Sequence, residues 1–160
     1  MAGLARRPEE GAALRRAQEL GKRTEYLAFA LGGDSYAVRI ELITEILRPP
    51  PITEVPRAPH PVRGVVSVRG RLVTVIDLRA RLRLAETPLD GRSRMLLAEH
   101  HGEAMGLLVD EVRQVYRLAE SEIEAAAVLG GEQPAYILGI GRPPGGGLLV
   151  LLDLRLVLEV

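Results

Sequence analysis

The sequence lacks cysteine and tryptophan, and it contains only one phenylalanine among its 160 residues. Without cysteine, neither a disulfide bond nor a thiolate metal site can form. Aromatic residues make up 3% of the chain and hydrophobic residues 47%, so the core must consist of leucine, valine and isoleucine. No apolar run approaches the roughly 20 residues needed to cross a bilayer. With no signal-peptide segment either, we expect a cytoplasmic protein without direct membrane insertion.

Motifs of catalysis and of nucleotide binding are also missing. None of the four serines lies in a G-x-S-x-G sequence, and Pro144 stands where a dinucleotide-binding loop needs its third glycine. His60, His100 and His101 lack metal-ligand spacing, and neighbouring residues of a strand point to opposite sides, so His100 and His101 are not expected to share a metal. The sequence predicts no enzyme, with no catalytic, cofactor-binding or metal-binding residue and no cofactor.

Two segments repeat the same pattern, VTVIDLR at 73–79 and LVLLDLR at 149–155. The repeat marks two similar β-units that share one core, or it arises by chance in a chain rich in leucine and arginine. In each copy the aspartate, Asp77 or Asp153, ends an apolar run. We expect each carboxylate to cap the turn that follows, because isolated aspartates at such places bond backbone amides more often than they act as an acid–base pair.

Charge is balanced overall, with 21 basic and 21 acidic residues, but it is unevenly placed. Residues 57–83 hold seven arginines against Asp77 alone, whereas residues 99–132 hold eight acids against Arg113 and Arg117. These two regions either face each other and water, or they form patches of opposite sign that dock different partners. The arginine-rich region carries no aromatic side chain on which a base could stack, so nucleic acid is not an expected partner.

Many short apolar segments separated by turn residues predict an all-β protein built as a barrel or sandwich. Two-residue turns at Arg69-Gly70 and His101-Gly102 indicate hairpins. A polar loop over 85–92 separates these hairpins, and one helical turn is expected at 119–126. Strands are expected at 24–31, 36–38, 62–68, 72–76, 95–100, 104–112, 112–118 and 135–141. Residues 148–160 are expected to begin as a strand and to end as a short helical or extended tail.

Two helices are expected besides these strands. Residues 1–23 form an N-terminal helical extension, which has too few large apolar residues to be stable alone. A second, short helix is expected over 39–48, because its isoleucines recur at helical spacing. Six prolines in 49–61 forbid both helix and central strand, so this stretch is an irregular connection.

The order of these motifs resembles that of the CheW-like domain, the chemotaxis coupling protein of bacteria. The resemblance rests on YLAFALGGDSYAVRIELITEIL, IxxVPxAPxxVRGVVSVRGRLVTVIDLR, GLLVDEV and YILGIGR with LLVLLDL, and it covers about residues 24–158. It implies two interlocked five-stranded SH3-like β-barrels around a shared aliphatic core in a domain spanning 24–160. The first barrel is expected mainly over 33–90 and the second mainly over 91–150, with the terminal strands contributing to both.

The resemblance also implies a function. Members of this family are non-enzymatic adaptors that link the cytoplasmic tip of a methyl-accepting chemoreceptor to the regulatory domain of a CheA-type histidine kinase. The protein is then expected at membrane-associated receptor arrays, and as a monomer when free. Two alternatives stay open: a module of the same fold serving a different chemosensory kinase pathway, for non-flagellar motility or development, and, more remotely, a nucleic-acid-binding barrel.

Partner-binding positions carry over by motif, without a division between receptor and kinase. They are Ile43, Glu45, Gly64, Arg69, Leu72, Gly106, Val112 and Val115. Arg69 and Glu45 are the strongest candidates, since a charge at these places lacks an evident role in the core. The sequence departs from the family pattern at Ser67, Thr74 and the His60-Pro61 pair, which puts contacts near that bend in doubt.

Overall fold

The computed structural model describes residue 11 and residues 22–160. The N-terminal helix expected over residues 1–23 therefore lies almost entirely outside the described part of the chain. Among the described residues, no helix is long and apolar enough to cross a membrane.

The described part of the chain is mostly β-structure, as the sequence predicts. Strands and helices follow one another as β1 (Thr24–Leu31), β2 (Asp34–Arg39), η1 (Ile40–Leu42), β3 (Glu45–Leu47), β4 (Val62–Val68), β5 (Arg71–Asp77), α2 (Leu78–Arg81), β6 (Arg94–His100), β7 (Glu103–Val109), β8 (Glu111–Leu118), η2 (Glu120–Glu122), β9 (Ile123–Ala125), η3 (Ala126–Leu129), β10 (Ile137–Gly141), β11 (Leu149–Leu152) and α3 (Leu154–Val157). The elements marked η are single turns of 3-10 helix.

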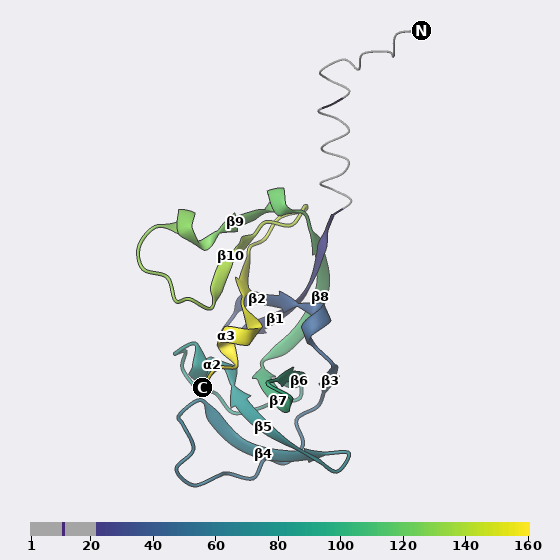
Figure 1. Cartoon of the computed structure of the whole chain (residues 1–160), viewed down its shortest axis with the longest axis vertical. Coiled ribbons are helices and arrows are strands. Elements are labelled where there is room, and N and C mark those ends of the chain that lie inside the picture. The colour runs from purple at the N-terminus through teal and green to yellow at the C-terminus, as the bar shows by residue number, and fades with distance from the viewer. Residues whose placement is uncertain (1–10, 12–21) are drawn as a thin grey trace.

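The strands form two sheets that exchange one strand each. The six-stranded sheet has the order β8-β1-β2-β11-β10-β9, and the five-stranded sheet has the order β3-β6-β7-β5-β4. Strand β3 follows the β1–β2 hairpin but pairs with β6, whereas β8 follows the β6–β7 hairpin but pairs with β1. In Figure 1 the β4–β5 hairpin lies at one end of the molecule and β9 and β10 lie towards the other. The two halves are therefore interlocked.

The repeated VTVIDLR and LVLLDLR segments occupy equivalent places in the two sheets. Strand β5 runs parallel to β7 and antiparallel to β4, just as β11 runs parallel to β2 and antiparallel to β10. The carboxylate of Asp77 accepts a hydrogen bond from the Arg79 amide at 3.0 Å, and that of Asp153 accepts one from the Arg155 amide at 3.1 Å. The repeat thus marks two similar β-units, and both aspartates cap short helices as predicted.

One buried cluster joins the two sheets. It contains Phe29 and Val38 from the six-stranded sheet and Ile76 and Leu107 from the five-stranded sheet. A smaller cluster lies within each sheet, around Leu118 in one and around Met95 and Val73 in the other. The shared core is mainly leucine, valine and isoleucine, as the composition predicts. Because residues of both sheets form this one core, the two sheets pack as a single unit.

The helix expected over residues 39–48 is wrong. Only the 3-10 turn Ile40–Leu42 forms, and Glu45–Leu47 is strand β3. The backbone amide of Thr44 donates to the carbonyl of Leu97 at 2.8 Å, which starts the pairing of β3 with β6. Pairing with a strand some fifty residues away satisfies the backbone and outweighs the helical spacing of the isoleucines, which also have high β-propensity.

The two sheets do not divide the chain into a first half and a second half. The six-stranded sheet takes strands from residues 24–39 and from 111–152, whereas the five-stranded sheet takes its strands from residues 45–109. A first barrel over 33–90 and a second over 91–150 therefore do not coincide with the sheets. Where the barrel boundaries lie stays a prediction.

Candidate functional site

The tip of the β4–β5 hairpin presents Arg69 to solvent. Arg69 and Gly70 form a two-residue turn with φ of 52° and 76°, the pair of left-handed conformations that matches the twist of a hairpin. Gly70 adopts this conformation freely, whereas Arg69 is a non-glycine residue in a region that L-residues seldom occupy. The Arg69 side chain is 72% exposed. The turn thus holds a cation on a short, well-defined projection.

Arg69 makes a two-pronged ion pair with Glu45, the first residue of β3. Its Nη1 donates to Glu45 Oε2 at 2.5 Å, and its Nη2 donates to Glu45 Oε1. These hydrogen bonds lower the pKa of the Glu45 carboxyl and raise the pKa of the Arg69 guanidinium. Both groups are therefore fully charged at neutral pH. The structure brings together the two residues that the sequence favoured, although it places Glu45 on a strand rather than on a helix.

The ion pair lies on the rim of a groove of about 360 Å³ on the five-stranded sheet. A second rim pair joins Arg71 Nη1 to Glu99 Oε1 at 3.0 Å, and Arg71 Nη2 donates to the Gly102 carbonyl at 3.3 Å. The groove residues are Thr44, Glu45, Val68, Arg69, Arg71, Val73, Leu97, Ala98, Glu99 and Ala104. Its lining combines small and aliphatic side chains with two arginine–glutamate pairs, which suits an amphipathic segment of a partner protein.

Leu72 lies next to these residues but outside the groove. It is 68% exposed and sits opposite Ser67 on β4. Because side chains alternate along a strand, Leu72 projects from the opposite side of β5 to Arg71 and Val73. An apolar side chain this exposed at a hairpin is suited to burial against another molecule.

The two glycines predicted as contact positions are buried by neighbouring backbone and core atoms. A Cβ at Gly64 would lie 2.1 Å from the Thr53 carbonyl oxygen, and Gly64 has a φ of 149°. A Cβ at Gly106 would lie 2.7 Å from Sδ of Met95, a fully buried side chain. Both glycines allow close packing, so any influence on partners acts through the fold.

The remaining predicted positions lie partly in the core. Ile43 and Val112 are half-buried and pack against the shared cluster. Val115 is more open, at 40% exposure on β8, where it pairs with Leu27 of β1. Of the eight predicted positions, the accessible side chains are thus Arg69, Leu72 and Val115, with Glu45 partly covered by its ion pair.

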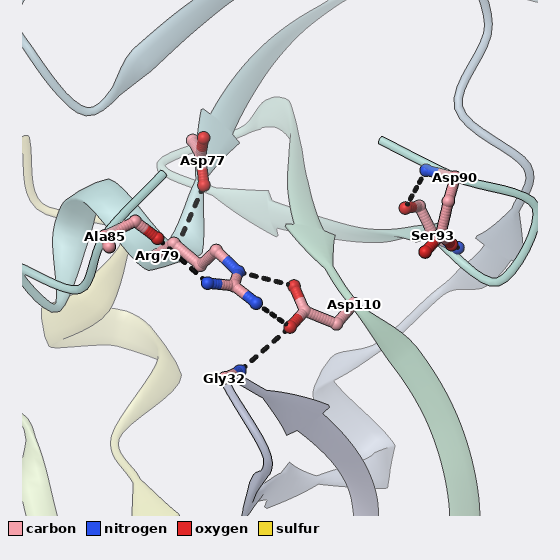
Figure 2. A network of polar contacts seen from close by, with 7 residues as sticks. All are labelled: Gly32, Asp77, Arg79, Ala85, Asp90, Ser93 and Asp110. Carbon is pink, nitrogen blue, oxygen red and sulfur yellow. Dashed lines mark hydrogen bonds and ion pairs between the residues drawn. The ribbon is translucent and has the colours of Figure 1, made fainter. Parts of the chain in front are cut away.

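The structure also shows a polar network that the sequence did not predict (Figure 2). Arg79 on α2 donates from Nε to Asp110 Oδ1 at 2.7 Å and from Nη2 to Asp110 Oδ2. The backbone amide of Gly32, in the β1–β2 turn, donates to Asp110 Oδ2 at 2.8 Å, and Arg79 Nη1 donates to the carbonyl of Ala85 at 2.9 Å. The network ties the five-stranded sheet to a turn of the six-stranded sheet. Arg79 belongs to the repeated Asp-Leu-Arg sequence, but nothing in the sequence indicated that it pairs with Asp110.

Asp110 is held in its charged form by this network. Partial burial acts to raise the pKa of its carboxyl, but the hydrogen bonds from Arg79 and from the Gly32 amide lower it further, so the net pKa lies below the usual value of 3.8. The Arg79 and Asp110 side chains are only 15% and 29% exposed. A pair this well shielded and satisfied fixes the relative position of the two sheets.

Arg81, the second arginine of α2, donates hydrogen bonds to α3. Arg81 donates from Nε to the Val157 carbonyl at 2.9 Å and from Nη2 to the Leu156 carbonyl at 3.0 Å. Its guanidinium also lies 4.9 Å from the centre of the Tyr136 ring. Helices α2 and α3 therefore lie side by side, and the two repeated units contact each other directly (Figure 1).

The sequence and the fold agree with a known family. The model of the CheW-like domain matches residues 25–160, so the chain belongs to the CheW-like family. The chain is also similar to a crystal structure of the scaffolding protein TtCheW from Thermoanaerobacter tengcongensis. The TM-score is 0.77 at 26% identity, with 86% of this chain and 94% of that chain covered.

Curated relatives point the same way. The chain is 26% identical over 139 residues to the chemotaxis protein CheW of Helicobacter pylori, covering 87% of this chain and 84% of that one. It is 32% identical over 108 residues to CheW of Bacillus subtilis, covering 68% and 69%. It is 35% identical over 95 residues to the protein PilI of Pseudomonas aeruginosa, covering 59% and 53%. The prediction of a chemotaxis adaptor of the CheW kind is confirmed at the level of the family.

Proposed function

We propose that this protein is an adaptor that holds a chemoreceptor cytoplasmic tip and the regulatory domain of a CheA-type histidine kinase in one complex, and that it catalyses no reaction itself. Membership of the CheW-like family supports the adaptor role. The shared core and the Arg79–Asp110 network support a rigid body, which an adaptor needs if two partners are to be held at fixed positions. On this proposal the protein acts in the cytoplasm, at receptor arrays.

The observation that carries the proposal is the exposed Arg69–Glu45 pair on the rim of the groove. Glu45 engages two of the five guanidinium N–H groups of Arg69, so others are available to a partner's carboxylate or backbone carbonyl. The apolar side chains of the groove favour an amphipathic helix, and its arginine–glutamate rim orients that helix. We assign this groove to the receptor tip.

One comparison bears on the alternative, a different chemosensory kinase pathway. The match to PilI extends over 95 residues of a relative that is not called CheW. The alternative, a module for a different chemosensory kinase pathway, differs in the identity of the partners and not in the surface used. Copurification of a kinase without a chemoreceptor would favour it.

Replacing Arg69 with alanine tests the proposal. We expect the dissociation constant for the receptor tip to rise about tenfold or more, because charge-assisted hydrogen bonds to the partner are lost. The melting temperature should stay within about two degrees, because exposed ion pairs contribute little to stability. Isothermal titration calorimetry and thermal unfolding measure the two quantities.

Arg142→Ala is the matched control. Arg142 is also an exposed arginine paired with a glutamate, with Nη2 at 3.1 Å from Glu124 Oε2, but it follows β10 of the six-stranded sheet. Its replacement should leave receptor binding unchanged. Equal affinity of the Arg69→Ala variant and the original chain, or an equal loss in the control, would contradict the assignment of the groove.

A further inference from the structure

A cluster of two histidines and a glutamate lies outside the groove lining, where the β6–β7 turn meets the segment after α3. His100 is the last residue of β6, His101 begins the turn, and Glu159 follows α3. The Nε2 atoms of His100 and His101 lie 2.9 Å and 3.0 Å from Oε1 of Glu159. The two imidazole rings are 4.1 Å apart between centroids. Three ligand atoms of types that bind metals thus share one small space.

The sequence-based expectation that His100 and His101 point apart is wrong. That expectation assumes an extended strand, in which neighbouring side chains alternate. His101 instead has a φ of 52°, because it occupies the first position of the His101-Gly102 turn. The left-handed backbone returns its side chain to the side of His100.

His100 provides a further observation at this cluster. Its side chain is only 13% exposed, and Nε2 is buried without a hydrogen-bond partner among the described residues. Glu159 Oε1 is close, but the contact lacks the geometry of a hydrogen bond. In the tautomer that carries its proton on Nδ1, the Nε2 lone pair and the Glu159 carboxylate oxygen are both acceptors, so a cation bound between them satisfies both groups.

We propose that His100, His101 and Glu159 bind one divalent transition-metal ion of the zinc type. The three ligand atoms lie within 4.8 Å of one another. Ligands about 2.1 Å from a tetrahedral ion lie about 3.4 Å apart, so the Nε2–Oε1 contacts need to widen by only about half an ångström. Two imidazoles and one carboxylate favour zinc and the neighbouring transition metals. They disfavour calcium and magnesium, which prefer oxygen ligands alone. Water completes the coordination, since His101 and Glu159 are well exposed.

The proposed ion would connect two segments that lie far apart in the sequence. It links the β6–β7 turn of the five-stranded sheet to the segment after α3, which follows the last strand of the six-stranded sheet. The same turn supplies the Gly102 carbonyl that Arg71 bonds on the groove rim. Binding to the folded state alone raises its stability by mass action.

Titrating Zn²⁺ into the untagged 160-residue chain, after removal of metal with a chelator, tests the site. We expect one ion per chain by calorimetry, and a melting temperature about 5 °C higher in saturating Zn²⁺. Co²⁺ should give the visible absorption of a four-coordinate ion.

His101→Ala and Glu159→Gln are the informative variants, because both side chains are exposed and their loss does not disturb the core. Each should weaken Zn²⁺ binding at least tenfold. His60→Ala is the matched control, since His60 is an equally exposed histidine 3.6 Å from Glu86. The site is overturned if 1 mM Zn²⁺ gives neither binding heat nor a thermal shift, if binding persists in the His101→Ala/Glu159→Gln double variant, or if His60→Ala weakens it as much.

Discussion

Replacing Gly64 with alanine is expected to lower the free energy of unfolding by about 3 kcal/mol or more. The new Cβ would lie 2.1 Å from the Thr53 carbonyl oxygen, a backbone atom fixed by its bridge to Val65. In that bridge the Thr53 and Val65 amides each donate to the other's carbonyl, at 2.9 Å and 2.8 Å. Relief of the clash therefore requires loss of this connection. Urea unfolding followed by far-ultraviolet circular dichroism measures the change, since the chain lacks tryptophan.

Gly33→Ala separates the clash from backbone strain. Gly33 also has a left-handed φ, of 90°, but a Cβ there would meet no described atom within 4 Å. We expect this control to lose only about 1 kcal/mol. A Gly64→Ala variant as stable as the control, yet unable to bind a partner, would contradict the structural role and make Gly64 a contact residue.

Breaking the Arg79–Asp110 network is expected to have the second largest effect. Arg79→Ala and Asp110→Ala should each lower the free energy of unfolding by about 2–4 kcal/mol, because each leaves a shielded charge without its partner. The Arg79→Ala/Asp110→Ala double variant should lose less free energy of unfolding than the sum of the two single losses, because both single variants break the same interaction. Urea unfolding of the four proteins completes the cycle.

Arg155→Ala is the control for this cycle, because Arg155 stands at the same place in the second Asp-Leu-Arg repeat but is exposed. It should be close to neutral. Acid provides a separate check. The pKa of Asp110 is lowered in the folded state, so its stabilising contribution is complete above its unfolded value, near 3.8, and is lost as pH falls through the lower folded value. The stability gap between the original chain and Asp110→Asn should therefore narrow below pH 3.8, and a gap constant down to pH 2 would contradict the charged pair.

Much of the fold could be predicted because the hairpins depend on local chemistry. The Arg69-Gly70 and His101-Gly102 turns each have two residues with positive φ between apolar strands, and such turns set the register of the strands beside them. The exchange of β3 and β8 between sheets depends on contacts far apart in the chain. It left no local signal, which is why residues 39–48 suggested a helix.

The candidate site was predictable only in part, for the same reason. A cation at a hairpin tip indicates exposure, so Arg69 could be identified from the sequence. Its ion pair with Glu45 depends on where β3 pairs, and the ion pair of Arg79 depends on how α2 packs against Asp110, between β7 and β8. Gly64 and Gly106 follow family motifs, but only the packing around them shows why a side chain is excluded.

We infer that this chain holds two proteins together on one rigid body. The most direct measurement is capture of a CheA-type regulatory domain on an immobilised chemoreceptor tip, with the adaptor added at increasing concentration. We expect little capture of the kinase domain without the adaptor, and capture that rises to one kinase domain per adaptor when it is added. With the Arg69→Ala variant, neither the adaptor nor the kinase domain should be retained on the surface. Competition between receptor tip and kinase domain for the adaptor, so that either partner displaces the other, would contradict it.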